Sequence, residues 1–282
     1  MLEQVTTAAA VEERSRPNGM SGHNPRTARS RPRRVLHEAE SGFEVDDDGF
    51  AVLSSIRSGT PVDLSTDQIQ AIWGHLTVAG LIQGTIVHSI IDQILAVLDR
   101  SLLRIDLAIG TDAATGPAAL VVGEQSSVLL TGHGEPEAAY RLYSHHDTLP
   151  ALIDYLGLQN RPFHDSPAVQ VSTMALAEAA STADRPARTR KVLCEAGVTV
   201  ESAELVAELL QKCAFSVQAS ARWQVSRYSY ANQSFSFLDG GALGYWTVTT
   251  RGVGHGMVQL QPSTATSITA GIRSMFAKAR LA

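Results

Sequence analysis

The feature that most constrains the fold is a pattern of hydrophobic residues that occurs twice in the same order. In residues 85–156, a strongly apolar helical segment precedes four strand-like segments and an amphipathic helix. Residues 200–280 repeat that order. Apolar residues with a period of 3.6 indicate a helix, and those with a period of two indicate a strand. The chain therefore reads as a degenerate duplication of one unit.

The same periods predict the boundaries of the elements. In the first copy we expect a helix over 85–98, strands over 102–109, 118–122, 127–131 and 137–143, and a helix over 148–156. In the second copy we expect a helix over 200–212, strands that begin near Phe215, Ser234, Leu243 and Met257, and a helix from Ser263. The strand over 102–109 is the clearest, because apolar and charged residues alternate along it as in a strand with one buried face.

Four antiparallel strands in a row need helices over one face, and their unpaired edges invite another strand. Two such units satisfy both needs when they pair edge to edge. We therefore predict an α+β fold of two pseudo-twofold-related halves, each an antiparallel β-meander with covering helices, joined around a central sheet. The folded domain is predicted over 42–282, with its halves at 42–160 and 161–282.

The first 41 residues differ from the rest of the chain. They hold seven arginines between Arg14 and Arg34 and few bulky apolar residues, which is typical of a disordered tail. Such a tail allows weak nucleic-acid binding, although the formal net charge of −5 argues against a nucleic-acid surface over the whole fold.

No segment is long and apolar enough to predict a membrane span. The most apolar run, 85–98, is interrupted by His88, Asp92 and Gln93, and a span needs about 20 apolar residues. The chain also lacks the pattern of a secretory signal at its start. We expect a cytoplasmic protein with no membrane partner.

Glycines cluster near the C-terminus, at Gly252, Gly254 and Gly256. A dinucleotide-binding fingerprint requires G-x-G-x-x-G before a helix, but here Met257 stands near the place of the third glycine and an apolar strand-like run follows. The segment is better explained as the turn of a hairpin. We therefore predict no nucleotide cofactor.

The best grouping of reactive side chains is the stretch "SHHD", which contains His145, His146 and Asp147. Neighbouring residues on a strand point to opposite faces, so the two imidazoles could not both reach one ion from a strand. Asp147 also suits the N-cap of the helix that follows. We predict no catalytic residue, metal or cofactor. The alternative left open is a small-ligand-binding or metal-dependent enzyme that uses His145 and His146 in a cleft between the halves.

Aromatic residues are frequent in the second copy, above all in "SRYSYANQSFSF", residues 226–237. Tyr mixed with Ser, Asn and Gln is typical of adaptable recognition surfaces, and aromatic enrichment marks the cores of interfaces. Large aromatics also dominate the interiors of domains. Both interpretations, a partner surface and simple packing, stay open at this stage.

From Phe43 to the C-terminus, the chain resembles the EspG family of chaperones of type VII (ESX) secretion. The resemblance rests on "FEVDDDGFAVLSSI", on "VAGLIQGTIVHSIIDQILAVLDRSLLRIDLAI" and on "GALGYWTVTTRGVGHGMVQLQPSTATSITAGIRSMF". It implies two related α+β halves around a central antiparallel sheet. It also implies a cytosolic, non-enzymatic adaptor that binds PE–PPE heterodimers at the apolar tip of their helices and keeps them soluble for export.

The resemblance further implies two contact segments. The first is the loop "GTDAATGP", residues 110–117, with Thr111, Asp112 and Thr115 as candidate partner-binding residues. The second is the aromatic segment, with candidates Tyr228, Tyr230, Phe235 and Phe237. For the free protein, the resemblance leaves a monomer or a homodimer open.

Overall fold

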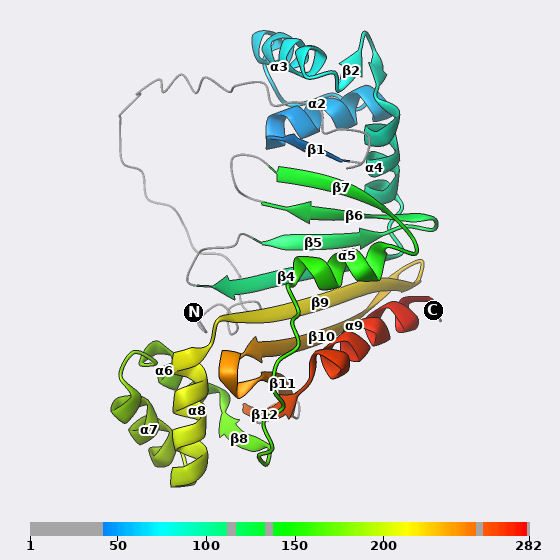
Figure 1. Cartoon of the computed structure of the whole chain (residues 1–282). Coiled ribbons are helices and arrows are strands. Elements are labelled where there is room, and N and C mark those ends of the chain that lie inside the picture. Colours follow the sequence, from blue (N-terminus) through cyan, green and yellow to red (C-terminus); the bar gives the residue numbers. More distant parts are fainter. Residues whose placement is uncertain (1–41, 112–116, 133–137, 252–255, 281–282) are drawn as a thin grey trace, which may run out of the picture.

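A computed structural model describes residues 42–111, 117–132, 138–251 and 256–280 of the chain (Figure 1). The first half contains β1 (Gly42–Val45), α2 (Asp47–Ser58), α3 (Thr66–Val78), β2 (Ile82–Gln83), β3 (Ile86–Val87), α4 (Ser89–Asp99), β4 (Leu103–Thr111), β5 (Ala118–Val122), β6 (Ser126–Thr131), β7 (Ala138–Ser144) and α5 (Thr148–Tyr155). The second contains β8 (Val169–Ser172), α6 (Thr173–Ser181), α7 (Pro186–Glu195), α8 (Val200–Lys212), β9 (Phe215–Ser226), β10 (Ser229–Asp239), the 3-10 turn Gly241–Leu243, β11 (Tyr245–Arg251), β12 (Met257–Ser263) and α9 (Ala265–Arg280).

One antiparallel sheet connects the two halves. Its strand order is β1-β7-β6-β5-β4-β9-β10-β11-β12-β8, so β4 and β9 form the central pair. They pair from Leu103 opposite Trp223 to Thr111 opposite Phe215. The order is the same when read outward from this pair in either direction, as the duplication predicts.

The duplication extends further than the sequence pattern indicated. Each half begins with a short strand, β1 or β8, that pairs with the last strand of its own meander at the edge of the sheet. In each half, three helices stand between that edge strand and the first strand of the meander. These parts were not included in the predicted repeat, because short edge strands carry little periodic signal.

The structure corrects several predicted boundaries. The helix expected from Thr85 begins only at Ser89, because the preceding residues form the β2–β3 hairpin around Gly84, whose φ is +59°. The strand expected from Ser234 already begins at Ser229. Strand β11 and helix α9 each begin two residues later than predicted, at Tyr245 and Ala265.

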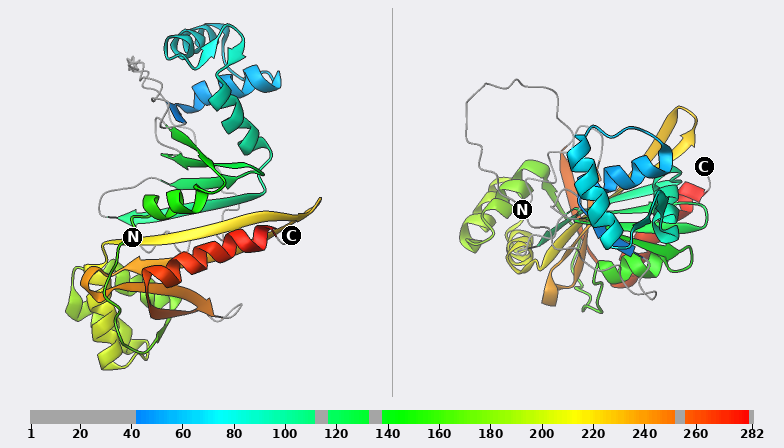
Figure 2. Two further views of the ribbon diagram at one scale, coloured as in Figure 1. Left: turned by 45° about the vertical axis from the view of Figure 1, so that its right-hand side comes forward. Right: turned by 90° about the horizontal axis from the view of Figure 1, so that it is seen from above.

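Helices cover the two faces of the sheet differently (Figures 1 and 2). Helices α5 and α9 pack on one face, where a single core cluster contains residues of β4, β5, β9 and β10 from both halves. On the opposite face, α2 and α4 cover the outer strands of the first half, and α6 and α8 cover those of the second. The helices therefore leave the middle of that second face uncovered.

The segment between the halves crosses the α5/α9 face and is fixed there by polar contacts. The amide of Gln159 donates to the hydroxyl of Tyr245 at 2.9 Å. Two residues on, the Nη2 of Arg161 lies 3.0 Å from the Oδ2 of Asp239, whose side chain is fully buried. That hydrogen bond is the main reason why the pKa of Arg161 is raised.

Replacing Arg161 by Ala is expected to lower the free energy of unfolding by about 2–3 kcal/mol. The buried carboxylate of Asp239 would keep only the amide of Gly241, at 2.8 Å, and an unpaired buried charge is costly. Adding Asp239→Asn to this variant should recover part of the lost unfolding free energy, because the side chain of Asn is neutral. Urea denaturation of both single variants and the double variant measures this coupling. A double variant that is less stable than Arg161→Ala would contradict it.

A second buried polar group lies at the edge of the sheet. The ring of Tyr140 stacks between Phe43 and Phe50, with centroid distances of 4.8 and 4.9 Å. Burial raises the pKa of Tyr140 from 10.0 to about 12, with a smaller contribution from the Asp47 carboxylate. The folded state therefore keeps this proton over a pH range in which the unfolded chain loses it.

Stability should consequently fall as the pH rises from 10 to 12, by about 1 kcal/mol per pH unit from this residue. Tyr140→Phe keeps the stacked rings and removes the ionisable hydroxyl, so its unfolding free energy should depend less on pH in this range. Denaturation curves at several pH values, with the exposed Tyr228→Phe as control, measure the difference. Equal pH dependence in both variants would show that Tyr140 does not titrate as described.

Candidate functional site

The uncovered middle of the sheet is the candidate site, and we call it the open face. It consists of alternate residues of the three central strands: Arg104, Asp106 and Ala108 of β4, Gln218, Ser220, Arg222 and Gln224 of β9, and Tyr230, Asn232 and Ser234 of β10. All are exposed except the half-buried Gln218 and Ser220. Their neighbours along each strand point to the α5/α9 core, so the strand period alone separates the two sets.

Positive charge and an aromatic ring meet at one end of the open face. Arg104 and Arg222 are directly opposite each other in the β4–β9 ladder. Asp106 accepts a hydrogen bond from the Nε of Arg104 at 2.8 Å, which offsets the repulsion between the two guanidinium groups. The guanidinium of Arg222 lies 4.2 Å from the ring centroid of Tyr230. Within the described residues, Arg222 makes no ion pair with a carboxylate. Its guanidinium is therefore available to pair with a carboxylate of a partner.

The β9–β10 hairpin extends the site beyond the end of the sheet (Figure 2). Its turn residue Tyr228 is 86% exposed and Tyr230 is 58% exposed. The guanidinium of Arg227 lies 5.5 Å from the ring centroid of Tyr228. Exposed Tyr and Arg side chains on a paired strand can anchor a partner with little loss of entropy.

Two of the aromatic candidates lie on the other face. Phe237 is 1% exposed and belongs to the core, where its ring contacts those of Phe215 and Tyr245. Phe235 is half-buried beneath α9, so close that a Cβ on Gly271 would lie 2.6 Å from its ring. Phe237 is therefore a core residue in this structure and Phe235 packs against α9, because odd-numbered positions of β10 face the covering helix.

Of the candidates in the loop 110–117, the structure places only the backbone of Thr111. Thr111 is the last residue of β4 and is opposite Phe215; its side chain, together with Asp112 and Thr115, lies outside the described residues. Phe215 and Ser226 are at opposite ends of β9, about 36 Å apart at roughly 3.3 Å per residue. A partner that contacts both the end of β4 and Tyr228 would have to extend along the whole open face.

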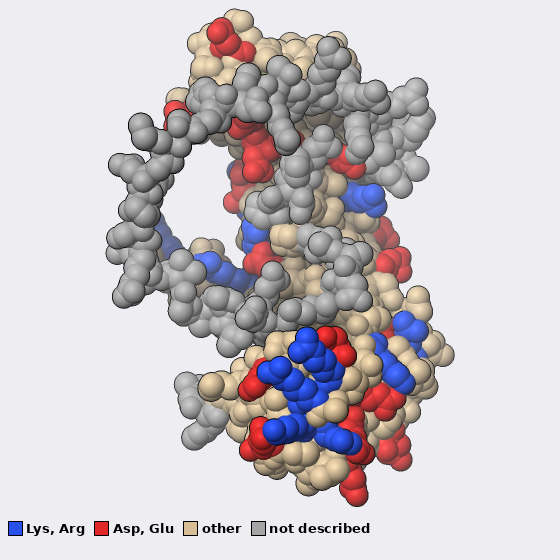
Figure 3. Space-filling model, turned by 90° about the vertical axis from the view of Figure 1, so that its left-hand side faces the viewer, with Lys and Arg blue, Asp and Glu red and all other residues tan. Residues whose placement is uncertain are grey.

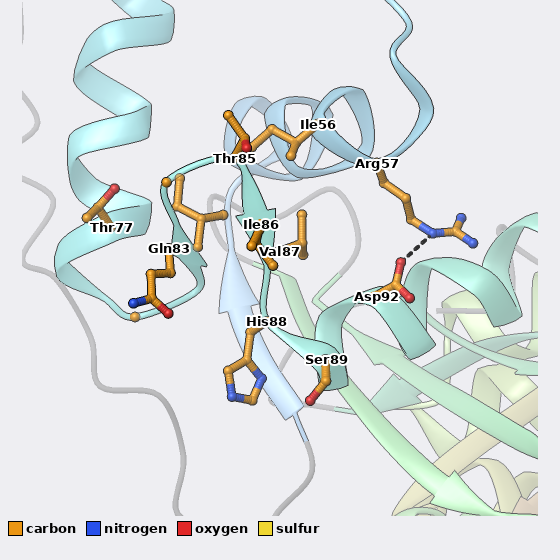
Figure 4. Close-up of a pocket in the computed structure, with 13 residues that line it drawn as sticks. Ile56, Arg57, Thr77, Gln83, Thr85, Ile86, Val87, His88, Ser89 and Asp92 are labelled. Carbon is orange, nitrogen blue, oxygen red and sulfur yellow. Dashed lines mark hydrogen bonds and ion pairs between the residues drawn. The ribbon is translucent and has the colours of Figure 1, made fainter.

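A hollow of about 920 Å³ lies beneath the β2–β3 hairpin (Figure 4). Its charged groups hold the surrounding helices together. Arg57 of α2 pairs with Asp92 at 2.8 Å and also with Asp99, both on α4. His88 caps α4, since its Nδ1 accepts from the amide of Ile90 at 3.4 Å. These side chains are engaged in structure, and the hollow lies far from the open face along the sheet (Figure 1).

The histidine pair of the alternative hypothesis occupies a turn rather than a strand. His145 and His146 follow β7, with ring centroids 6.4 Å apart and nearly perpendicular planes. The Asp147 side chain accepts from the Ser144 hydroxyl at 2.6 Å and makes no side-chain cap to α5. The pair lies next to the β5–β6 turn, where the His145 amide donates to Gln125, and so not between the halves.

The described part of the chain holds neither a metal cluster nor a membrane span. No three His, Cys, Asp or Glu side chains within it come together as a metal ion would require. No described helix combines the length and apolar character needed to cross a membrane. Gly252 and Gly254, where the turn of a hairpin was predicted, lie outside the described residues.

Sequence reasoning missed most of the open face. It selected aromatic residues and overlooked Arg104, Arg222 and the small polar residues between them. The signal was present in "SVQASARWQ", residues 216–224, whose polar positions alternate with buried ones. That alternation shows which side chains point away from the core, but it does not show whether helices pack over them in the folded protein.

Comparison with known proteins agrees with this architecture. The model described as the EspG family matches residues 50–274. Fourteen chains of solved structures match. One is the Mycobacterium tuberculosis type VII secretion system chaperone EspG5 in complex with the PE25–PPE41 dimer, with a TM-score of 0.57, 14% identity, and coverage of 83% of this chain and 95% of that chain. No curated protein matches by sequence. At this identity, the structural likeness concerns the fold.

Proposed function

Because this chain belongs to the EspG family, we propose that it is a non-enzymatic chaperone of type VII secretion that binds a PE–PPE heterodimer in the cytoplasm. The family match over residues 50–274 carries this proposal. The structural neighbour EspG5 is described in complex with such a dimer. In this proposal, residues 42–282 form the binding domain, with halves at 42–160 and 161–282, and the Arg-rich segment 1–41 is an appendage to it.

The open face is the surface we assign to the heterodimer. A helical tip with exposed apolar side chains aggregates unless a partner covers it, and a stable interface buries roughly 800 Å² on each partner. The open face offers small side chains in its middle, which let a helix end approach the sheet closely. Tyr230 and Arg222 at one end provide the aromatic and cationic anchors that dominate binding energy.

This assignment uses part of the predicted contact set. Tyr228 and Tyr230 stay in it, and the loop candidates Thr111, Asp112 and Thr115 remain part of the proposal without a described side chain. Phe235 and Phe237 support the surface from beneath. The enzyme alternative has no comparable support, because no observation places its histidines in a cleft between the halves.

Co-expression with PE–PPE pairs encoded by type VII secretion loci, followed by affinity capture and size-exclusion chromatography, tests the proposal. We expect one pair to co-elute with the chain as a ternary complex and to stay soluble only in its presence. If none of the pairs co-elutes with the folded chain, the chaperone assignment is wrong. Variants of the open face, treated in the Discussion, separate the assignment of the surface from that of the function.

A further inference from the structure

Helix α7 concentrates positive charge on its exposed side. Arg185, Arg188 and Lys191 follow one another at three-residue spacing and are all exposed, whereas Thr189 and Leu193 are fully buried. At 1.5 Å per residue, the three charges span about 9 Å of the helix. Figure 3 shows Lys and Arg side chains gathered low on the side of the molecule where α7 lies in Figure 1. We call these three residues the basic stripe.

The position of these positive charges lowers the stability of helix α7 itself. The N-terminal end of a helix carries partial positive charge, so cations there are unfavourable, and like charges three residues apart repel. The first turn of α7 holds no acidic residue. Arg185 is 3.4 Å from Asp184 and Lys191 is 3.7 Å from Glu195, both long and exposed contacts that contribute little. No ion pair of Arg188 is found among the described residues.

The duplicated architecture shows that the fold does not require these charges. Helix α3 has the corresponding place in the first half, as the second of three helices that precede the meander. Its sequence, "TDQIQAIWGHLTV", contains no Lys or Arg, and its first turn carries Asp67. A helix in this position can thus have the favourable charge distribution. The basic stripe belongs to one half alone, which suggests a binding role.

A small hollow lies beside the stripe. It measures about 240 Å³ and is lined by Pro186, Ala187, Arg190, Glu204, Ala207, Glu208 and Gln211, from α7 and α8. Arg190 and Glu204 pair across it at 2.8 Å, and two alanines keep part of its lining small and apolar. The hollow could accept one apolar side chain of a bound segment.

We propose that the basic stripe and this hollow form a docking surface for an acidic polypeptide segment, independent of the open face. Carboxylates spaced along a helix or strand could meet the three stripe residues in line while one apolar side chain enters the hollow. An anionic membrane fits less well. It would contact the carboxylates of Asp184, Glu195 and Glu204 as well as the stripe and Arg190. Four positive and three negative charges leave about one net positive charge, worth about 1 kcal/mol. Single-stranded nucleic acid fits less well too, because no aromatic residue for stacking is interleaved with the stripe.

Two matched variants of the full chain test this surface. Arg188→Ala/Lys191→Ala removes two charges of the stripe, and Arg273→Ala/Lys278→Ala removes an exposed Arg and Lys from α9. Alanine is a strong helix former, so both helices should persist. The probe is a short fluorescein-labelled poly-glutamate peptide, measured by anisotropy. We expect the α7 variant to bind at least about fivefold more weakly than the α9 variant, because the arginines of residues 1–41 contribute equally to both.

Hydrogen exchange adds a local readout. The peptide should slow amide exchange in residues 185–195 of the unmodified chain and leave that segment unchanged in the α7 variant. Equal affinities of the two variants, or no slowing in this segment, would overturn the proposal. It would also be overturned if phosphatidylglycerol vesicles or a DNA oligonucleotide depended on the stripe and the peptide did not. None of these outcomes bears on binding of a PE–PPE pair at the open face.

Discussion

Gly244→Ala is expected to lower the free energy of unfolding by about 3 kcal/mol or more. Gly244 joins the 3-10 turn to β11 with φ +72° and ψ −165°, a backbone conformation that is essentially restricted to glycine. A Cβ at this position would lie 2.2 Å from the carbonyl oxygen of Pro162. Since that oxygen belongs to the backbone of the connecting segment, the clash can be relieved only by moving the segment off the sheet.

Gly59→Ala is the matched control for this prediction. Gly59 also has a positive φ, +71°, but a Cβ added there would meet no atom within 4 Å, so the substitution adds backbone strain without a clash. It should cost about 1 kcal/mol. Thermal and urea unfolding of the two variants give the comparison. Equal losses would mean that the connecting segment does not press on Gly244.

The second large effect concerns the open face. In a chain that forms a PE–PPE complex, Arg222→Ala/Tyr230→Ala is expected to weaken binding by about 30-fold or more, corresponding to about 2 kcal/mol. The two side chains form one cation–π pair at 4.2 Å, and both would be buried by a partner on the sheet. Their removal should leave the fold intact, since neither contributes to a core cluster. Isothermal titration or biolayer interferometry measures the affinity.

Phe163→Ala provides the control for that experiment. Phe163 is 57% exposed, comparable to Tyr230, but its neighbours Pro162 and His164 lie against Gly244 and Trp246, which are not residues of the open face. Its loss should leave the affinity within about twofold of the original. If the Phe163 variant lost as much affinity as the open-face variant, the partner would have to contact the segment between the halves as well. If neither variant lost affinity, the assignment of the heterodimer to the open face would be wrong.

The candidate site shows why sequence reasoning pointed to a strand of the open face and to only some of its exposed residues. Tyr228 to Phe237 were chosen for their composition, and this segment does border the open face. Composition does not distinguish Tyr230 from Phe237, however, because both are aromatic residues between small polar ones. Burial separates them: Tyr230 is 58% exposed and Phe237 1%, since α9 packs on only one side of β10.

The sequence by itself determined the repeated order of helix, meander and helix, because hydrophobic periodicity is a local property that each segment carries independently of its neighbours. The sequence also determined that alternate side chains of β4 and β9 point away from the core. Only the tertiary structure decided that Arg104 stands opposite Arg222, that the end of β4 and the β9–β10 hairpin lie at opposite ends of one ladder, and that no described helix covers one face of that ladder. These facts depend on strand register and on where the helices pack, which are contacts between residues distant in the chain.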